Sequence, residues 1–325
     1  RQTFRNFISA FDVFSESDIY KTKIFKFNMN DGRLAYVASG KVPGSVLNQF
    51  SMDEYEDCFR IATTQGDVWR SGEGASKNNV YVFDGAMNMV GKLEGIAPGE
   101  KIYSVRFMGE RGYMVTFRTV DPFFVLDLKD PCNPRILGEL KIPGYSDYLH
   151  PYDANHVIGF GKDAVELWGA AFYMGMKMAI FDVSDVSKPR EMFSEKIGDR
   201  GTDSELLRNH KALLFSKDRN LLAFPVRVME VKGDGSGSNV LQYGSFSFQG
   251  AYVYSVNLRK GFVRKGKITH LSREDYIDAG NYWYDSEKDI ERIIHIDDTL
   301  YTLSKGMIKA NNLDDLRETG SLEIE

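Results

Sequence analysis

The chain has 325 residues, of which 42% are hydrophobic and 13% aromatic, enough to bury a large core in one or two domains. The formal net charge is −5 and there is no long basic block, so a nucleic-acid-binding surface is not expected. No transmembrane segment is expected either, because the longest apolar stretch, residues 167–183, is interrupted by Gly169, Gly175 and Lys177.

Two features bear on processing and compartment. The chain opens with RQTFRN, without Met and without a signal-like apolar segment, which favours a processed or truncated piece of a longer chain. Its two cysteines, Cys58 and Cys132, are far apart and indicate neither a disulfide framework nor a metal-ligand pair. Composition therefore leaves the compartment open.

A strand–turn–strand pattern recurs along the chain, most clearly as FVLDLKDPCNPR (124–135) and AIFDVSDVSKPR (179–190). In each copy an apolar run ends at an Asp, and a polar turn with Asp and Pro precedes a second run. Asp accepts hydrogen bonds from nearby backbone N–H groups, and Pro cannot continue a strand ladder, so both residues favour a tight turn. Looser copies occupy residues 23–42, 78–96, 251–271 and 306–324, with Asn257 in place of the Asp in the third of these.

A second pair of short strands precedes most of these copies, at residues 44–63, 102–117, 145–161, 203–224 and 292–304. Four strands per repeat predict an all-β fold of the β-propeller type, because stacked sheets cover each other's faces and leave short edges. Two β-sandwiches are the alternative, but they would not explain the even spacing.

We expect one propeller domain over residues 1–325, with about six four-stranded blades, of which the first is incomplete, with residues 6–14 as its inner strand. The expected blades are residues 1–43, 44–97, 98–144, 145–199, 200–271 and 291–325, with a polar insertion at 272–290.

The turns at residues 127–134 and 182–189 are expected to join the third and fourth strands of their blades. Phe124 and Ile180 are expected to occupy equivalent buried positions between blades.

The candidate site comes from polar residues in the expected first strands, which line the central channel of a propeller. The channel or binding candidates are Arg106, Asp147, His150, Glu205, Arg208 and His210, and the first strands also carry Asn48, Gln49, Ser104, Ser146 and Ser204. Asp147, His150, Glu205 and His210 offer oxygen and imidazole ligands for a divalent metal ion. The alternative is a channel in which these side chains simply face water. The chain has no GxSxG, HExxH, P-loop or GxGxxG motif, so no catalytic residue is assigned.

Three runs carry a family resemblance: residues 40–64, residues 93–153, which begin LEGIAPGEKIYSVRFMGERGYMVTF, and residues 300–316, LYTLSKGMIKANNLDDL. Together they resemble secreted archaeal and bacterial proteins with a C-terminal β-propeller domain, over roughly residues 20–325. The resemblance implies an exported or surface-anchored, extracellular protein with more propeller sequence upstream of Arg1. It implies no established reaction, and the opening RQTFRNFISAFDVF departs from the family.

Three functions remain open at this point. The first, which the absence of catalytic motifs favours, is a binding or scaffold module that presents a propeller face to a protein or glycan of the cell envelope. The second is a hydrolase that uses carboxylate and His residues, with or without a divalent ion, at the channel mouth. The third is a quinone-dependent dehydrogenase, which ranks last because the chain has only Trp69, Trp168 and Trp283 and lacks the repeated Trp motif of that class.

Overall fold

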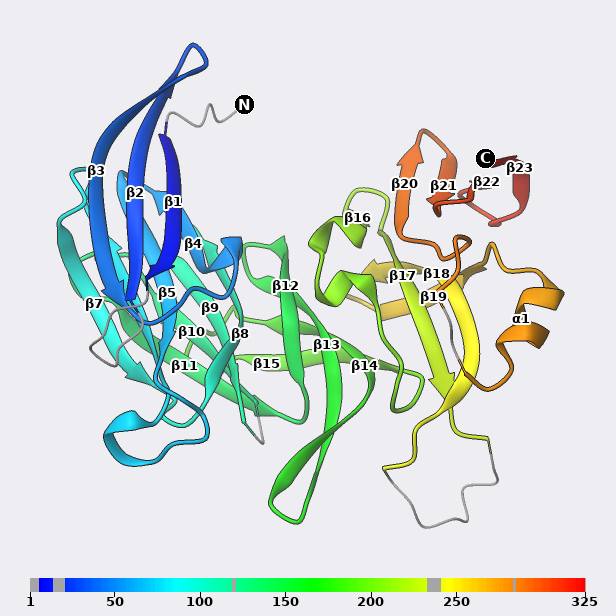
Figure 1. The fold of residues 1–325 in the computed structure, drawn as a ribbon, viewed down its shortest axis with the longest axis horizontal. Helices are drawn as coiled ribbons and strands as arrows, with labels where there is room; N and C mark the ends of the chain where they lie inside the picture. The colour runs from blue at the N-terminus through cyan, green and yellow to red at the C-terminus, as the bar shows by residue number, and fades with distance from the viewer. Residues whose placement is uncertain (1–5, 14–20, 119–120, 233–240, 283–284, 325) are drawn as a thin grey trace. The chain divides into compact units, whose positions relative to one another are not determined.

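The strands of the chain form six antiparallel sheets in a computed structural model that describes residues 6–13, 21–118, 121–232, 241–282 and 285–324. The chain divides into two compact units (Figure 1), which are described separately. Unit 1 comprises residues 1–142 and 183–189, and unit 2 comprises residues 143–182 and 190–325. The all-β prediction is confirmed, and α1 (Arg273–Ala279) is the one α-helix within the described residues.

Unit 1 contains three sheets, each ordered along the chain. The first has three described strands, and residues 6–13 pair with its middle strand as the inner partner expected from the sequence. The strands are β1 (Asn6–Val13), β2 (Lys21–Asn30) and β3 (Arg33–Pro43); β4 (Met52–Tyr55), β5 (Cys58–Gln65), β6 (Lys77–Phe83) and β7 (Met89–Ile96); and β8 (Lys101–Met108), β9 (Arg111–Phe117), β10 (Asp121–Asp127) and β11 (Arg135–Ile142).

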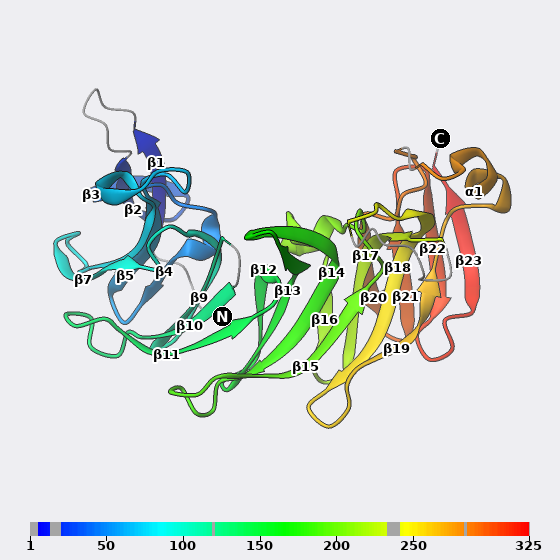
Figure 2. The ribbon, with the colours of Figure 1, turned by 90° about the horizontal axis from the view of Figure 1, so that it is seen from below.

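Unit 2 contains three four-stranded sheets, the last two of which lie side by side in Figure 2. The polar insertion between these two sheets contains α1, which begins with a capping box between Ser272 and Asp275. The strands are β12 (Tyr145–Asp153), β13 (His156–Leu167), β14 (Ala170–Asp182) and β15 (Arg190–Ile197); β16 (Leu214–Ser216), β17 (Leu221–Glu230), β18 (Ser245–Asn257) and β19 (Gly261–Ile268); and β20 (Arg292–Ile296), β21 (Thr299–Leu303), β22 (Met307–Asn312) and β23 (Glu318–Glu323).

The recurring Asp or Asn closes the turn between the third and fourth strands of each four-stranded sheet. The side-chain oxygen of Asp84 accepts from the backbone N–H groups of Ala86 and Asn88 at 3.0 and 2.8 Å. Asn257 accepts from two N–H groups in the same way, which explains why Asn substitutes for Asp there. In the two clearest copies the Asp also pairs with the Arg eight residues later, as Asp127 does with Arg135 and Asp182 with Arg190. The predicted role of these turns is therefore confirmed.

The same turns pack onto the fourth strand of the preceding sheet. A Cβ added to Gly91 would lie within 3.0 Å of the Pro131 carbonyl oxygen, and one added to Gly138 would lie as close to that of Val186. A Cβ added to Gly266 would lie 2.8 Å from the Cδ1 atom of the Leu316 side chain. Each of these glycines directly follows the extra residue of a β-bulge in its own strand, the fourth strand of the sheet. A fourth-strand glycine thus makes room for the next sheet's turn, which we call the turn-to-glycine contact.

The buried core lies between successive sheets. In unit 1, one cluster joins Ala62 and Val80 of one sheet to Met114, Phe124 and Leu126 of the next. In unit 2, an equivalent cluster lies between β16–β19 and β20–β23, where Ala223 and Val253 meet Ile293 and Leu300. Dense packing of this kind is sensitive to the loss of even a few methylene groups.

The predicted equivalence of Phe124 and Ile180 is wrong. Both side chains are buried, at 5% and 0% exposure. Counted back from Asp127 and Asp182, however, Phe124 matches Ala179, and Ile180 lies one position further along. Since successive side chains of a strand point to opposite faces, that shift of one residue exchanges the two faces of the sheet.

Truncation of Phe124 to Ala should destabilise unit 1 by about 3–5 kcal/mol, because it removes a large buried side chain and leaves a cavity. Urea unfolding of the two proteins measures the difference. Ile136→Ala is the control. Ile136 lies on the neighbouring strand with 42% of its surface exposed, so this substitution should lower the free energy of unfolding far less. A loss for Phe124→Ala no larger than that of the control would contradict its place in the core.

Candidate functional site

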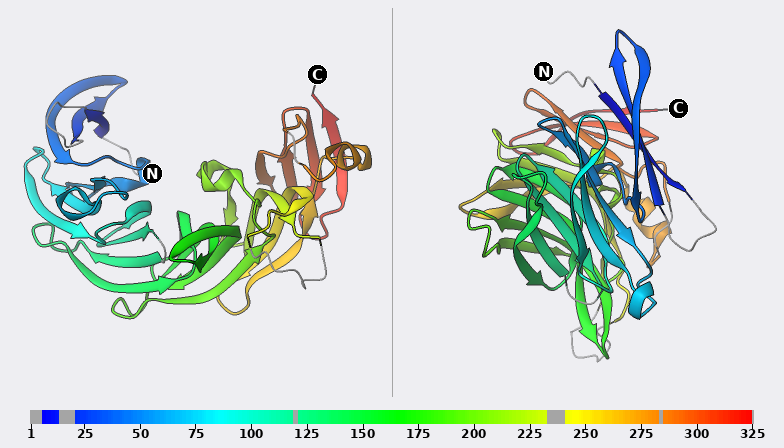
Figure 3. Two further views of the ribbon diagram at one scale, coloured as in Figure 1. Left: turned by 60° about the horizontal axis from the view of Figure 1, so that its bottom comes forward. Right: turned by 90° about the vertical axis from the view of Figure 1, so that its left-hand side faces the viewer.

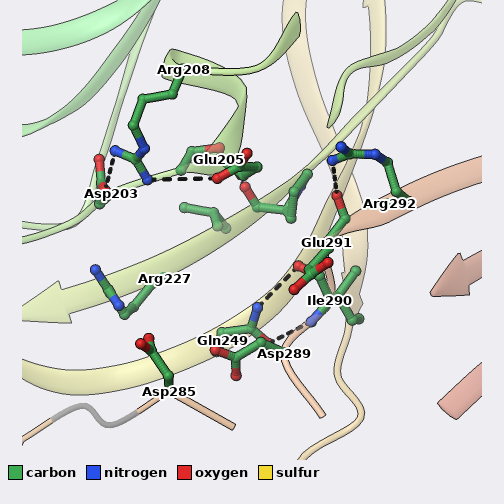
Figure 4. A pocket seen from close by; sticks show the side chains of 13 residues that line it. Asp203, Glu205, Arg208, Arg227, Gln249, Asp285, Asp289, Ile290, Glu291 and Arg292 are labelled. Carbon is green, nitrogen blue, oxygen red and sulfur yellow. Dashed lines mark hydrogen bonds and ion pairs between the residues drawn. The ribbon is translucent and has the colours of Figure 1, made fainter. Parts of the chain in front are cut away.

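A charged pocket of about 280 Å³ lies in unit 2 (Figure 4). It is lined by the loop before β16, by β17 and β18, and by the segment that leads into β20. Its charged side chains are five carboxylates and three arginines: Asp203, Glu205, Asp285, Asp289, Glu291, Arg208, Arg227 and Arg292. Two of the sequence candidates, Glu205 and Arg208, are among them.

The loop before β16 does not have the predicted strand structure. Residues 205–207 and 210–212 form two short 3-10 turns, and β16 starts only at Leu214. Ser204 caps the first turn by accepting from the Leu206 N–H at 3.2 Å, and Asn209 caps the second by accepting from the Lys211 N–H at 3.2 Å. Ser and Asn favour such caps, since their side chains replace a missing backbone acceptor.

A similar correction applies to the expected first strand that carries Asn48 and Gln49. Residues 49–51 form a 3-10 turn capped by Asn48, whose side chain accepts from the Phe50 N–H at 3.0 Å. The strand β4 follows only at Met52.

Asp203 is the centre of an ion-pair network at one side of the pocket. Its carboxylate lies 3.0 Å from the Lys162 ammonium and 2.7 Å from the Arg208 guanidinium. Arg208 also reaches Glu205, at 3.9 Å. Burial alone would raise the pKa of Asp203, but Lys162 and Arg208 outweigh that effect and hold the pKa below its usual range. Asp203 and Arg208 therefore form a fixed pair of charges at the pocket wall.

Asp147, on β12, faces the same network. Burial raises the pKa of its carboxyl to about 7, and the nearby Asp203 carboxylate adds to this, while Lys162 and Arg208 oppose it. The structure thus brings three of the predicted candidates, Asp147, Glu205 and Arg208, into one electrostatic neighbourhood. Asp203 and Lys162, which link them, were not among the candidates.

The opposite wall is held by Gln249, whose side chain is buried on β18. Its amide nitrogen donates to the Ile290 carbonyl oxygen and its amide oxygen accepts from the Ile290 N–H, both at 3.2 Å. Ile290 is itself buried in the core between the last two sheets. This clamp fixes the positions of Asp289 and Glu291, the two neighbours of Ile290 in the chain.

Asp289 has the least satisfied carboxyl in the pocket. Its Oδ1 atom is fully buried and has no hydrogen-bond partner within the described residues. Burial raises the pKa of Asp289 to about 7, and the carboxylates of Asp285 and Glu291 raise it further, against the effect of Arg227. Asp289 therefore changes charge near neutral pH, and its Oδ1 atom is a buried acceptor that no described residue satisfies.

The two candidate histidines lie against aromatic rings and are not among the residues that line the pocket. The Nδ1 atom of His150 is 3.1 Å from the Tyr148 hydroxyl oxygen. The His150 ring packs edge-on against Phe215, with 4.7 Å between the ring centres. The ring of His210 lies 6.0 Å from that of Tyr148. In the part of the chain that the structure describes, no three His, Cys, Asp or Glu side chains are grouped as they would be to hold a metal ion. The divalent-ion hypothesis for Asp147, His150, Glu205 and His210 gains no support from this arrangement.

Arg106, the remaining candidate, belongs to unit 1. Its guanidinium carbon lies 4.2 Å from the centre of the Phe50 ring, a cation–π contact. Whether it lines a central channel with the candidates of unit 2 stays a prediction.

Sequence reasoning missed the pocket residues that follow the insertion, Asp285, Asp289, Glu291 and Arg292. The available signal was the charge density of DSEKDIERI (285–293), which a solvated insertion explains equally well. Only the Gln249 clamp, made by residues about 40 positions apart, places this segment beside the loop before β16.

Asp147→Asn should alter the pH dependence of stability. The unfolded chain loses the Asp147 proton near pH 4, whereas the folded chain keeps it to about pH 7. The free energy of unfolding of the native protein should therefore fall relative to that of Asp147→Asn as pH rises from about 4 to about 7, and stay level above. Tm measured for both proteins across that range tests this, and Asp218→Asn, at an exposed turn position, reports the effect of net charge alone. A constant Tm difference between native protein and Asp147→Asn would refute the assignment.

The described residues contain no helix with the length and apolar character needed to cross a membrane. Among solved structures, the chain is similar to the WD40 domain of Neurospora crassa Pan2, with a TM-score of 0.45 and 9% identity, covering 97% of this chain and 78% of that one. It is also similar to a Synechocystis apocarotenoid oxygenase, with a TM-score of 0.39 and 5% identity, covering 93% of this chain and 70% of that one.

Among curated proteins, an uncharacterised protein of Methanocaldococcus jannaschii is 39% identical over 249 residues, covering 73% of this chain and 37% of the relative. One of Archaeoglobus fulgidus is 41% identical over 208 residues, covering 64% of this chain and 30% of the relative. The matched part is thus about a third of the length of these relatives. The family model described as a β-propeller domain matches residues 9–316, and with the six antiparallel sheets this shows that the chain belongs to the β-propeller domain family.

Proposed function

We propose that this propeller is a binding or scaffold module whose charged pocket in unit 2 holds a cationic group of a cell-envelope protein or glycan. The observation that carries the proposal is the charge balance of the pocket, which has five carboxylates and three arginines. Arg208 is paired with Asp203 and Glu205, and Arg292 donates to the Glu291 carbonyl oxygen at 2.8 Å. Carboxylates therefore remain in excess in a cavity large enough for an ammonium or guanidinium group.

The wall geometry supports recognition by hydrogen bonds as well as by charge. The Asp289 Oδ1 atom is a buried acceptor without a partner in the described chain, and Glu205 and Glu291 line the same pocket. An N–H donor of a bound amine would satisfy Asp289 and favour its charged form. Because the Gln249 clamp fixes the segment already, little ordering cost would accompany binding.

Titration with a tri-lysine peptide, followed by calorimetry, tests this proposal, with tri-glutamate and a neutral oligosaccharide as comparison probes. We expect tri-lysine alone to bind, and Glu205→Gln or Asp289→Asn to weaken its binding about tenfold or more through loss of a charge-assisted hydrogen bond. Glu139→Gln, a surface change in unit 1, is the matched control and should bind as the native chain does. Equal binding by Asp289→Asn and the native chain would reject the pocket as the site.

A hydrolase is the second candidate, and one observation favours it. A carboxyl with a pKa of about 7, as Asp289 has, suits a general acid or base at neutral pH. Hydrolysis of an added peptide or oligosaccharide that disappears in Asp289→Asn would identify this activity, whereas binding without turnover would support the module.

We also propose that the protein is exported or attached to the cell surface, which rests on the sequence resemblance. Brief protease treatment of intact cells should then release peptides of this chain, with a cytoplasmic protein of the same cells left intact as the control. Protection of the chain until the cells are lysed would reject the surface location.

A further inference from the structure

The last sheet of unit 2, β20–β23, has two largely apolar faces, and the described residues of unit 2 cover only one of them. Strand pairing places Ile293 beside Thr302, and His295 beside Leu300, on one face. Ile293, Thr302 and Leu300 are buried, and this face packs against the sheet β16–β19. Figure 3 shows β20–β23, in orange and red, as the outermost sheet of unit 2.

The register places the alternate residues on the opposite face, which we call the outer face. Ile294, Tyr301 and Ala310 follow one another in one row across three strands, and Leu303, Ile308 and Leu322 do so in the next row. The exposed fractions are 45% for Ile294, 58% for Ile296 and 62% for Leu322. Each of the four strands therefore contributes at least one large apolar side chain to this face, which is unusual for a solvated face. The apolar side chains of the outer face are Ile294, Ile296, Tyr301, Leu303, Ile308, Ala310 and Leu322, and the same register also places Arg292, Thr299, Asn312 and Gly320 there.

Other sheets in the chain show what covers such a face. Residues 112–117 of β9 are all buried, as is every residue of β14 from Gly175 on, so both faces of these strands are covered. By contrast, β21 alternates between buried and half-exposed residues. Phe124 and Leu126 show what covers such a face within one unit: both side chains pack against the neighbouring antiparallel sheet. The apolar composition of the outer face is therefore that of a sheet that packs on another sheet.

One glycine identifies the missing contact more closely. Gly91, Gly138 and Gly266 each follow the extra residue of a bulge in the fourth strand, and each is in contact with the third-to-fourth-strand turn of the next sheet. Gly320, on β23, has the same register position, because it pairs with Ala310 and follows the extra residue Thr319 of a bulge. A Cβ added to Gly320 would have nothing within 4 Å. The last sheet thus has the glycine of a turn-to-glycine contact without the turn.

We infer that the outer face of β20–β23 is a blade-packing interface for a further four-stranded sheet of the same repeat, contributed by sequence of the same polypeptide outside residues 1–325. The third-to-fourth-strand turn of that sheet would pack on Gly320. The matched relatives have room for it, because the matched part is 37% and 30% of their lengths. A second copy of this chain, or residues 21–43, are the other occupants that the test must separate.

Photo-crosslinking in the natural gene product identifies the occupant. A benzophenone amino acid replaces Tyr301, in the middle of the outer face, and the crosslinked peptide is identified by mass spectrometry. The expected partner is a segment of the same polypeptide outside residues 1–325. Crosslinks to residues 21–43, crosslinks between two copies, or no crosslink at all would each overturn the inference. The same label at Ile277, which is 66% exposed on α1, is the control and should not give that product.

Paired glycine substitutions test the predicted turn contact independently. In the 325-residue chain, Gly138→Val should lower Tm, because Val186 already occupies the space, whereas Gly320→Val should leave Tm unchanged. In the natural gene product, Gly320→Val should remove the Tyr301 crosslink and increase deuterium uptake in residues 318–323. If Gly320→Val leaves both the crosslink and the uptake of the natural product unchanged, no turn packs on Gly320 and the inference fails.

Discussion

The turn between the third and fourth strands of each sheet supports the rest of this fold. In the four-stranded sheets its first residue is an Asp or Asn, whose side-chain oxygen accepts hydrogen bonds from backbone N–H groups of the turn. These bonds end the third strand at a fixed residue. The turn then contacts the fourth strand of the preceding sheet, at Gly91, Gly138 and Gly266. In β15 the corresponding register position is Phe193 and not a glycine. Here the glycine lies on the side of the turn instead, because Phe193 packs against Gly261, which directly follows the turn between β18 and β19. The local turn and the packing between sheets are thus specified by the same few residues.

The charged pocket uses elements that this repeat does not specify. Most of its charged side chains come from the loop before β16 and the segment after α1, both outside the regular strands, whereas β17 and β18 contribute Arg227 and Gln249. Such segments can vary in sequence without disturbing the sheets, which is why function often resides in loops held by a rigid scaffold. Here the scaffold acts through Gln249, a strand residue that holds the loop segment by its backbone. Charges that would separate in a flexible loop are kept together in this way.

The sequence was informative where local chemistry decides the outcome. The turns after Asp127 and Asp182, the Asn257 substitution and the all-β fold all follow from residue types a few positions apart. The pairing of Phe124 with Ile180 was an error of one position, which counting back from Asp127 and Asp182 removes; apolar residues on both faces of the strand gave no alternation that would have revealed it. Sequence reasoning also failed at residues 203–213, where Ser204 and Asn209 cap 3-10 turns in a segment that the spacing of the repeat had assigned to a strand.

The sequence by itself determined the repeat, the type of sheet and most turns, since hydrogen bonds within a turn and apolar runs of strand length act over short distances. Only the tertiary structure decided which charged residues meet. Asp147, Lys162, Asp203 and Arg208 come from different strands and a loop, and Asp289 joins the pocket through a clamp from Gln249. Electrostatic interactions depend on distance and burial, which are properties of the folded chain and not of sequence order. The same holds for the outer face of β20–β23, whose side chains are recognisable as one surface only after strand pairing sets their register.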